Sequence, residues 1–110
     1  QTQNPFQVNS GISYYFDGTG DYLTAPYNTV YDWWKGNFTI EAWVYPITPS
    51  TGNTQTVFVK GTTSTAIMKM FIDPSFKVNA QHNGTIITST ATLAANTWSS
   101  IAMVRNACSP

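Results

Sequence analysis

The chain has 110 residues, of which 42% are hydrophobic, 15% aromatic and only 9% charged. Its length fits one domain, taken as residues 1–110, and its apolar content argues against a disordered chain, while no apolar stretch reaches the ~20 residues that span a membrane. Five basic side chains balance five acidic ones, so no basic cluster exists to neutralise phosphates, which argues against nucleic acid as a partner.

Short β-branched and aromatic runs recur along the chain, separated by clusters of Gly, Pro, Asn and Ser. This pattern is typical of an all-β antiparallel sandwich, and no segment shows sustained helical periodicity. A single helical turn is predicted at residues 30–34. The predicted strands are residues 6–8, 13–16, 22–25, 38–45, 56–60, 67–72, 77–81, 85–90 and 98–105.

Three short polar segments between these runs predict turns. Residues 17–20 read Asp-Gly-Thr-Gly, and their glycines can adopt the positive φ of a tight turn. Residues 73–75 read Asp-Pro-Ser, which favours a turn after the strand that precedes them. Asn83 and Gly84 form the strongest two-residue hairpin signal in the chain.

The clearest predicted strand is residues 38–45, because alternate residues of a strand point to opposite faces. One face holds Phe38, Ile40, Ala42 and Val44, and the other holds Thr39, Glu41, Trp43 and Tyr45. We expect the first face in the core. The second mixes rings with a hydroxyl and a carboxylate, as expected where the outer face of a sheet is partly covered or meets a ligand.

The last predicted strand is apolar on both faces. Ile101 and Met103 alternate with Ala102 and Val104, which predicts burial on both sides. The sequence ends soon after this strand, and we therefore expect that neighbouring strands lie outside the sequence or come from another chain.

Four segments carry a resemblance to a known family. They are residues 15–23, 37–44 and 82–84, and residues 96–98 together with 101–105. In this order they resemble the laminin-G-like jelly-roll family, which includes pentraxin-like and concanavalin A-like lectin sandwiches. The resemblance implies a jelly-roll sandwich that lacks the family's C-terminal strands. It also implies an extracellular or virion-surface setting, where such modules bind glycans or proteins or decorate a surface, in some cases within a larger assembly.

The aromatic residues suggest a binding role. Sugar recognition places exposed rings against the apolar faces of pyranoses and uses polar side chains for the hydroxyl groups. Trp34, Trp43, Tyr45 and Glu41 are the candidate ligand-binding residues. The alternative is that the rings plug the ends of the sandwich or form a protein interface.

Asp17 and Asp21 flank the glycine-rich turn and are the candidate metal ligands. Carboxylates are hard oxygen ligands of the kind calcium prefers, although calcium takes about six to eight of them. The alternative is that Asp17 caps its own turn through backbone N–H groups. Calcium is thus a candidate cofactor.

The residues of common catalytic sites are sparse. A glycosidase needs two carboxyl groups about 5 to 9 Å apart, and Glu41 has no acidic neighbour within four positions. His82, interpreted as a solvated turn residue, and Cys108 are the only histidine and cysteine, so a nucleophilic triad is not indicated. We therefore expect no enzymatic activity; the alternative is a fragment of a concanavalin-like glycoside hydrolase whose catalytic carboxylates lie outside this chain.

Overall fold

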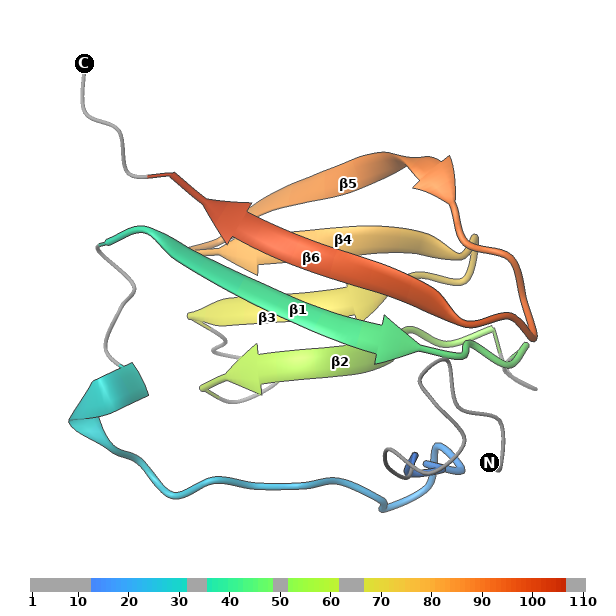
Figure 1. Cartoon of the computed structure of the whole chain (residues 1–110), viewed down its shortest axis with the longest axis horizontal. Coiled ribbons are helices and arrows are strands. Elements are labelled where there is room, and N and C mark those ends of the chain that lie inside the picture. The colour runs from blue at the N-terminus through green and yellow to red at the C-terminus, as the bar shows by residue number, and fades with distance from the viewer. Residues whose placement is uncertain (1–12, 32–35, 49–51, 62–66, 107–110) are drawn as a thin grey trace.

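The computed structural model describes residues 13–31, 36–48, 52–61 and 67–106. Its strands form two β-sheets that face each other (Figure 1). The strands are β1 (Phe38–Val44), β2 (Gln55–Lys60), β3 (Met68–Ile72), β4 (Lys77–His82), β5 (Thr85–Thr92) and β6 (Ser99–Arg105), preceded by a 3-10 turn, η1 (Thr29–Tyr31). The prediction of an all-β antiparallel sandwich is confirmed.

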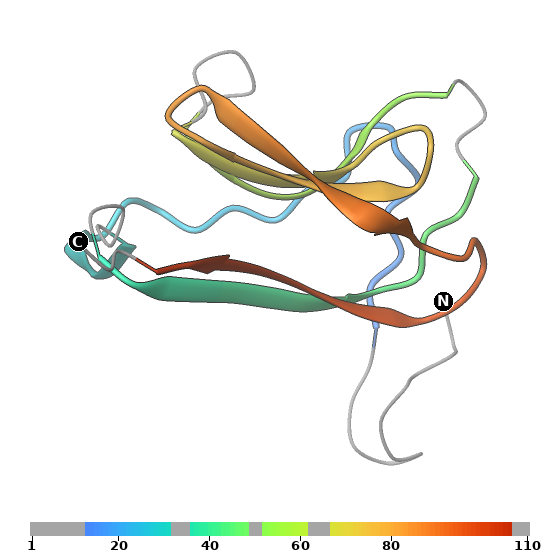
Figure 2. The same cartoon turned by 90° about the horizontal axis from the view of Figure 1, so that it is seen from above.

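The sheets differ in size. β2, β3, β4 and β5 form a four-stranded sheet in chain order, and β1 pairs with β6 in a two-stranded sheet. All ladders are antiparallel. Figure 2 shows the two layers facing each other across the core. The β1–β6 ladder joins the first strand to the last, with Phe38 opposite Arg105. Arg105 Nη1 also donates to the carbonyl of Gly36 at 2.7 Å.

The core lies between the layers and depends on the two-residue period of the strands. Met68 and Met70 of β3 are fully buried. Ile101 and Met103 of β6 are also buried, with exposed fractions of 5% and 8%. The alternate residues of β1, from Phe38 to Val44, pack against this group and are half-buried. The predicted core face of residues 38–45 is therefore confirmed.

The prediction that β6 is buried on both faces is wrong. Ile101 and Met103 face the core, but Ala102 is exposed and Val104 is 65% exposed. The reason is architectural: the β1–β6 layer forms one side of the sandwich, and no described element covers its outward face (Figure 2). Alanine and valine tolerate such exposure because scattered apolar side chains are normal on protein surfaces.

The predicted strands at residues 13–16 and 22–25 are also wrong, since neither belongs to a ladder within the described part of the chain. A β-branched or aromatic run forms a strand only where a neighbour accepts its backbone hydrogen bonds. The helical turn predicted at residues 30–34 is found slightly earlier, at Thr29–Tyr31, where Asn28 Oδ1 accepts a bond from the Val30 N–H at 3.0 Å. Residues 6–8 and 32–34 lie outside the described residues.

The predicted turns are confirmed. Asn83 and Gly84 have φ of 47° and 83° and connect β4 directly to β5, as a two-residue hairpin with φ positive at both positions requires. The turn at residues 73–75 closes with a bond from the Phe76 N–H to the Asp73 carbonyl at 2.9 Å. Gly18 and Gly20 adopt φ of 88° and 78° in the first turn.

Candidate functional site

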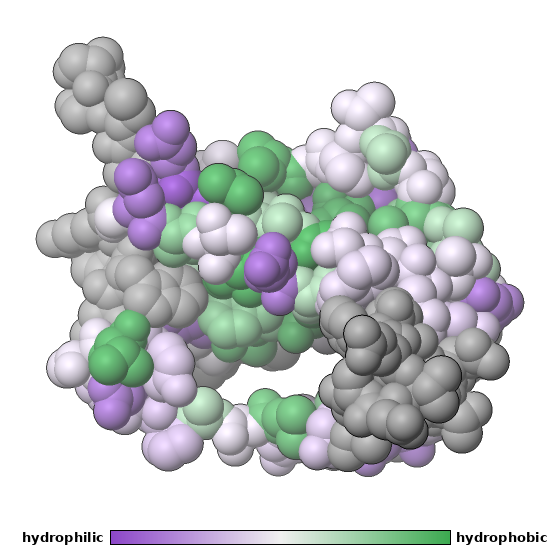
Figure 3. Space-filling model, viewed as in Figure 1, coloured by the Kyte–Doolittle hydropathy of each residue, from purple (hydrophilic) through white to green (hydrophobic). Residues whose placement is uncertain are grey.

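The outward face of the β1–β6 sheet carries the side chains with the greatest capacity for recognition. On β1 this face presents Thr39, Glu41 and Trp43, all exposed. The ladder places Trp43 opposite Ser100 and Glu41 opposite Ala102, so exposed small residues of β6 flank them. Figure 3 views the molecule from this side. We call this surface the outer face.

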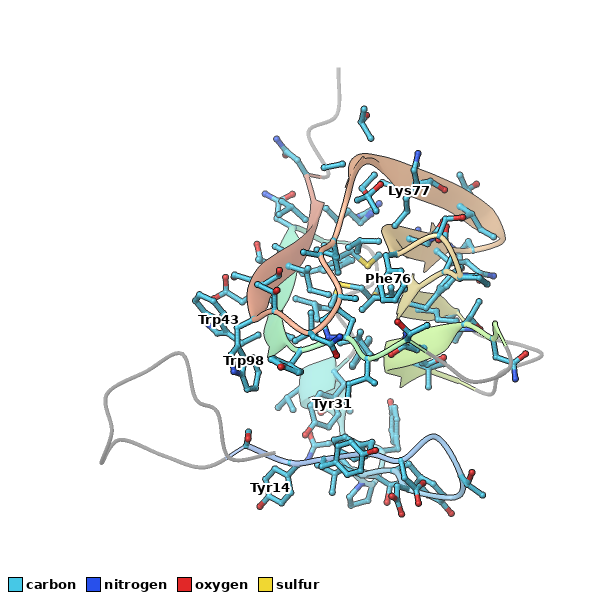
Figure 4. The ribbon with its side chains drawn as sticks, turned by 90° about the vertical axis from the view of Figure 1, so that its right-hand side faces the viewer. Tyr14, Tyr31, Trp43, Phe76, Lys77 and Trp98 are labelled. Carbon is cyan, nitrogen blue, oxygen red and sulfur yellow. The ribbon has the colours of Figure 1, made fainter. Side chains whose placement is uncertain are left out.

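An aromatic cluster continues the outer face at one end. Tyr45 follows Trp43 by two residues and Trp98 precedes Ser100 by two, so Tyr45 and Trp98 lie just beyond the ends of β1 and β6, and both side chains are half-buried. Their centroids are 5.5 Å apart with an interplanar angle of 61°, an edge-to-face arrangement favoured by the ring quadrupoles. Figure 4 shows Trp43 and Trp98 on the outward side of the β1–β6 layer.

The loop that leads into β6 holds this cluster in place. The Asn96 N–H donates to the Pro46 carbonyl at 2.8 Å, which ties the residues before β6 to those after β1. Trp98 is half-buried, and its Nε1 is enclosed without a hydrogen-bond partner. Trp98 therefore forms the inner part of the cluster, in contact with Tyr45. Trp43 is 46% exposed and is the ring of this surface that a partner can reach most easily.

The structure unites most of the predicted ligand-binding residues. Trp43 and Glu41 lie two positions apart on the outer face, and both are exposed. Tyr45 is half-buried against Trp98, so it contributes mainly to the cluster. Trp34 lies outside the described residues. Trp98 was not predicted for this site. Once the β1–β6 register is known, its position two residues before Ser100 indicates that it lies near Tyr45.

Asp17 and Asp21, the predicted metal ligands, share one exposed turn. Asp17 Oδ1 accepts a bond from the Thr19 N–H at 2.7 Å, and Asp21 Oδ2 accepts one from the Asp17 N–H at 3.2 Å. Each carboxylate thus stabilises the turn. Over the described ranges of the chain, no group of three or more His, Cys, Asp or Glu residues is gathered in a way that could hold a metal ion.

The interpretation of His82 as a solvated turn residue is wrong. His82 ends β4 and is half-buried, with its ring centroid 6.5 Å from that of Phe38 across the two layers. It helps to close one end of the sandwich. Cys108 lies outside the described residues.

No helix in the described segments has the length and apolar character needed to cross a membrane. No curated protein and no solved structure matches the chain. A family model described as the concanavalin A-like lectin/glucanases superfamily matches residues 17–109, which is most of the chain and includes all six strands. The chain belongs to the concanavalin A-like lectin/glucanase superfamily.

Proposed function

We propose that this chain is a non-catalytic recognition module that binds a surface glycan through the outer face of the β1–β6 sheet. The observation that carries the proposal is the exposed Trp43 ring between the carboxylate of Glu41 and the Tyr45–Trp98 pair. A pyranose presents an apolar face and a rim of hydroxyl groups. Trp43 supplies a surface for the first, and Glu41 and Ser100 supply hydrogen-bonding groups for the second.

The sheet makes this arrangement rigid. Glu41, Trp43 and Ser100 all lie within paired strands, whose positions are fixed by the packing of the opposite, core-facing residues. A prearranged site loses less conformational entropy on binding than a loop would.

The hydrogen bonds that the described aspartates accept support the proposal of a non-catalytic role. Asp73 accepts hydrogen bonds in the β3–β4 turn, and Asp17 and Asp21 accept them in their own turn. Glu41 belongs to another element, β1, where it is exposed on the outer face. A glycosidase requires two carboxyl groups free to act on one bond. An assay for release of reducing sugar from glucans checks this point directly, and hydrolysis by the purified chain would contradict it.

The binding proposal is tested with a glycan array followed by titration of the strongest hit, each with calcium and with a chelator. Replacing Trp43 with Ala is expected to weaken binding about tenfold or more, as for a central aromatic contact. Tyr14→Ala is the matched control, because Tyr14 is an exposed ring, 66% accessible, on a different segment. Glu41→Gln separates charge from hydrogen bonding.

Two outcomes would overturn the assignment. A large fall in melting temperature for Trp43→Ala would make the ring part of the core, and equal losses for Trp43→Ala and Tyr14→Ala would remove the outer face from consideration. If no glycan binds but a neighbouring protein subunit does, and Trp43→Ala abolishes that contact, the same face is a protein interface. Loss of binding with the chelator would implicate calcium.

A further inference from the structure

The charge of the outer face comes from one side chain. Its exposed residues pair directly across the ladder as Thr39 with Val104, Glu41 with Ala102, and Trp43 with Ser100. Glu41 is the only charged residue among these pairs. Figure 3 shows a strongly hydrophilic patch over the middle of the β1–β6 layer, bordered by apolar and weakly polar surface.

The register leaves the Glu41 carboxylate without a counterion. An opposite charge directly across the ladder would be its usual stabilising partner, but Ala102 occupies that position, and its methyl group has neither charge nor hydrogen-bond donor. The next outward residues of β1, Thr39 and Trp43, are neutral. No hydrogen bond or ion pair to the carboxylate is found among the described residues.

The cationic side chains in the described part of the chain lie on other elements or are directed elsewhere. Lys60, Lys69 and Lys77 belong to the four-stranded sheet, which is the other layer of the sandwich. Arg105 ends β6, and its guanidinium donates to the Gly36 carbonyl. The described outer face is therefore locally negative, although the basic and acidic residues of the whole chain are equal in number.

Trp43 adds a second feature that favours a cation. The face of an indole ring attracts an ammonium group through its quadrupole, and a carboxylate accepts a charge-assisted hydrogen bond from the same group. Side chains two positions apart on a strand start about 7 Å from each other, a spacing comparable with the width of one sugar unit. One pyranose with an attached amine can therefore contact both Trp43 and Glu41.

We propose that the outer face selects glycans that carry unacetylated amino sugars, such as glucosamine units, and disfavours glycans with carboxylate or sulfate groups. This inference rests on the proposed function, which makes the outer face the glycan-binding surface. The sugar ring lies against Trp43, and its ammonium group pairs with Glu41. An acidic glycan places a like charge beside Glu41, and the repulsion weakens its binding.

The experiment compares two oligosaccharides that differ only in acetylation. Glucosamine and N-acetylglucosamine oligomers of the same length and linkage are titrated into the protein by calorimetry, at a pH that keeps carboxylates charged and sugar amines protonated. The glucosamine oligomer is expected to bind about fivefold to tenfold more tightly, as for one exposed ion pair with one cation–π contact. Added salt is expected to reduce this difference, and a galacturonic acid oligomer is expected to bind more weakly than either.

Three variants assign the preference to its residues. Glu41→Gln removes the charge and keeps the shape of the side chain, so it is expected to abolish the difference between the two oligomers. Asp73→Asn is the matched control, because it makes the same change in net charge in the β3–β4 turn of the other layer, and it is expected to retain the preference. Trp43→Ala is expected to weaken both oligomers. Circular dichroism of each variant confirms that the sheets are intact.

The outcomes separate this inference from the proposed function. Equal binding of the two oligomers, with both weakened by Trp43→Ala, would overturn the inference and leave glycan binding at the outer face intact. A preference that survives Glu41→Gln, or tighter binding of the galacturonic acid oligomer, would overturn it too. Equally tight binding of an oligolysine of the same length would do so as well, since charge alone would then be recognised. If none of the oligosaccharides binds, the inference is overturned, and the glycan array decides the proposed function with other sugars.

Discussion

Asn79 Nδ2 donates a hydrogen bond to Asp73 Oδ2 at 3.0 Å, which joins the interior of β4 to the turn that precedes it. Asn79 is only 4% exposed. Its remaining groups are also occupied: Nδ2 donates to the Lys77 carbonyl at 3.1 Å, and Oδ1 accepts from Thr88 Oγ1 of β5 at 2.5 Å. One buried amide thus connects a turn and two strands, as buried polar groups require.

The first prediction concerns the pH dependence of stability. The bond from Asn79, with backbone bonds from Lys77 and Ser75, lowers the pKa of Asp73 below its ordinary value of 3.8. A carboxyl whose pKa is lowered in the folded state stabilises the fold above its unfolded pKa, and this contribution is lost as pH falls through the folded pKa. Denaturant unfolding of the unmodified chain and Asp73→Asn, measured across the acid range, is expected to show a smaller loss of stability on acidification for the variant. Parallel curves would contradict it.

The second prediction concerns the amide itself. Asn79→Leu leaves the Thr88 hydroxyl and the Asp73 carboxylate without this partner, which is expected to cost about 1–3 kcal/mol of unfolding free energy. Thr88→Val removes the partner on β5, and the double variant closes a mutant cycle. Because the two groups share a hydrogen bond, the combined loss is expected to be smaller than the sum of the single losses. Strict additivity would show that the bond contributes no coupling energy.

Local patterns predicted the parts of the fold that depend on local geometry. The two faces of β1 followed from alternation, because a strand directs neighbouring residues to opposite sides whatever it pairs with. The Asn83–Gly84 hairpin followed from the residues that tolerate positive φ. Glu41 and Trp43 were placed together for the same reason, since parity alone puts them on one face.

The rest depended on pairing between distant segments. Trp98 meets Tyr45 only because β6 pairs with β1 in the register that sets Val44 opposite Ser99, and nothing local to either residue specifies that register. The exposure of Val104 likewise follows from which layer β6 joins. Residues 22–25 have the composition of a strand, but composition cannot supply the neighbour that a ladder requires.

The third prediction tests the core. Met70 is fully buried between the layers, and Met70→Ala is expected to cost about 2–5 kcal/mol through lost burial and the cavity left behind. Ile86→Ala is the control, because this side chain is 51% exposed on the outward face of β5, and its loss is expected to be small. Thermal unfolding followed by circular dichroism measures both. Similar losses at the two positions would mean that the sheets do not pack through Met70.

The calcium hypothesis for Asp17 and Asp21 remains a prediction and has a direct test. An ion held by both carboxylates stabilises the folded state by an amount that grows with the logarithm of its concentration above the dissociation constant. It is therefore expected to raise the melting temperature in a way that a chelator reverses and Asp17→Asn removes. Asp73→Asn is the control, because its carboxylate lies in another turn. Melting that does not respond to calcium would leave Asp17 and Asp21 with only their roles in the turn.

The last prediction isolates backbone conformation at the β4–β5 hairpin. Gly84 has φ of 83°, and a Cβ added there would meet no atom within 4 Å, so any cost of Gly84→Ala comes from the left-handed backbone and not from a clash. That cost is expected to be about 1–2 kcal/mol. A D-alanine at the same position, introduced by chemical ligation, favours positive φ and is expected to stabilise the hairpin by about 0.4–1 kcal/mol, because it restricts the unfolded chain. Equal destabilisation by both enantiomers would indicate a steric conflict and would contradict the open surroundings of this turn.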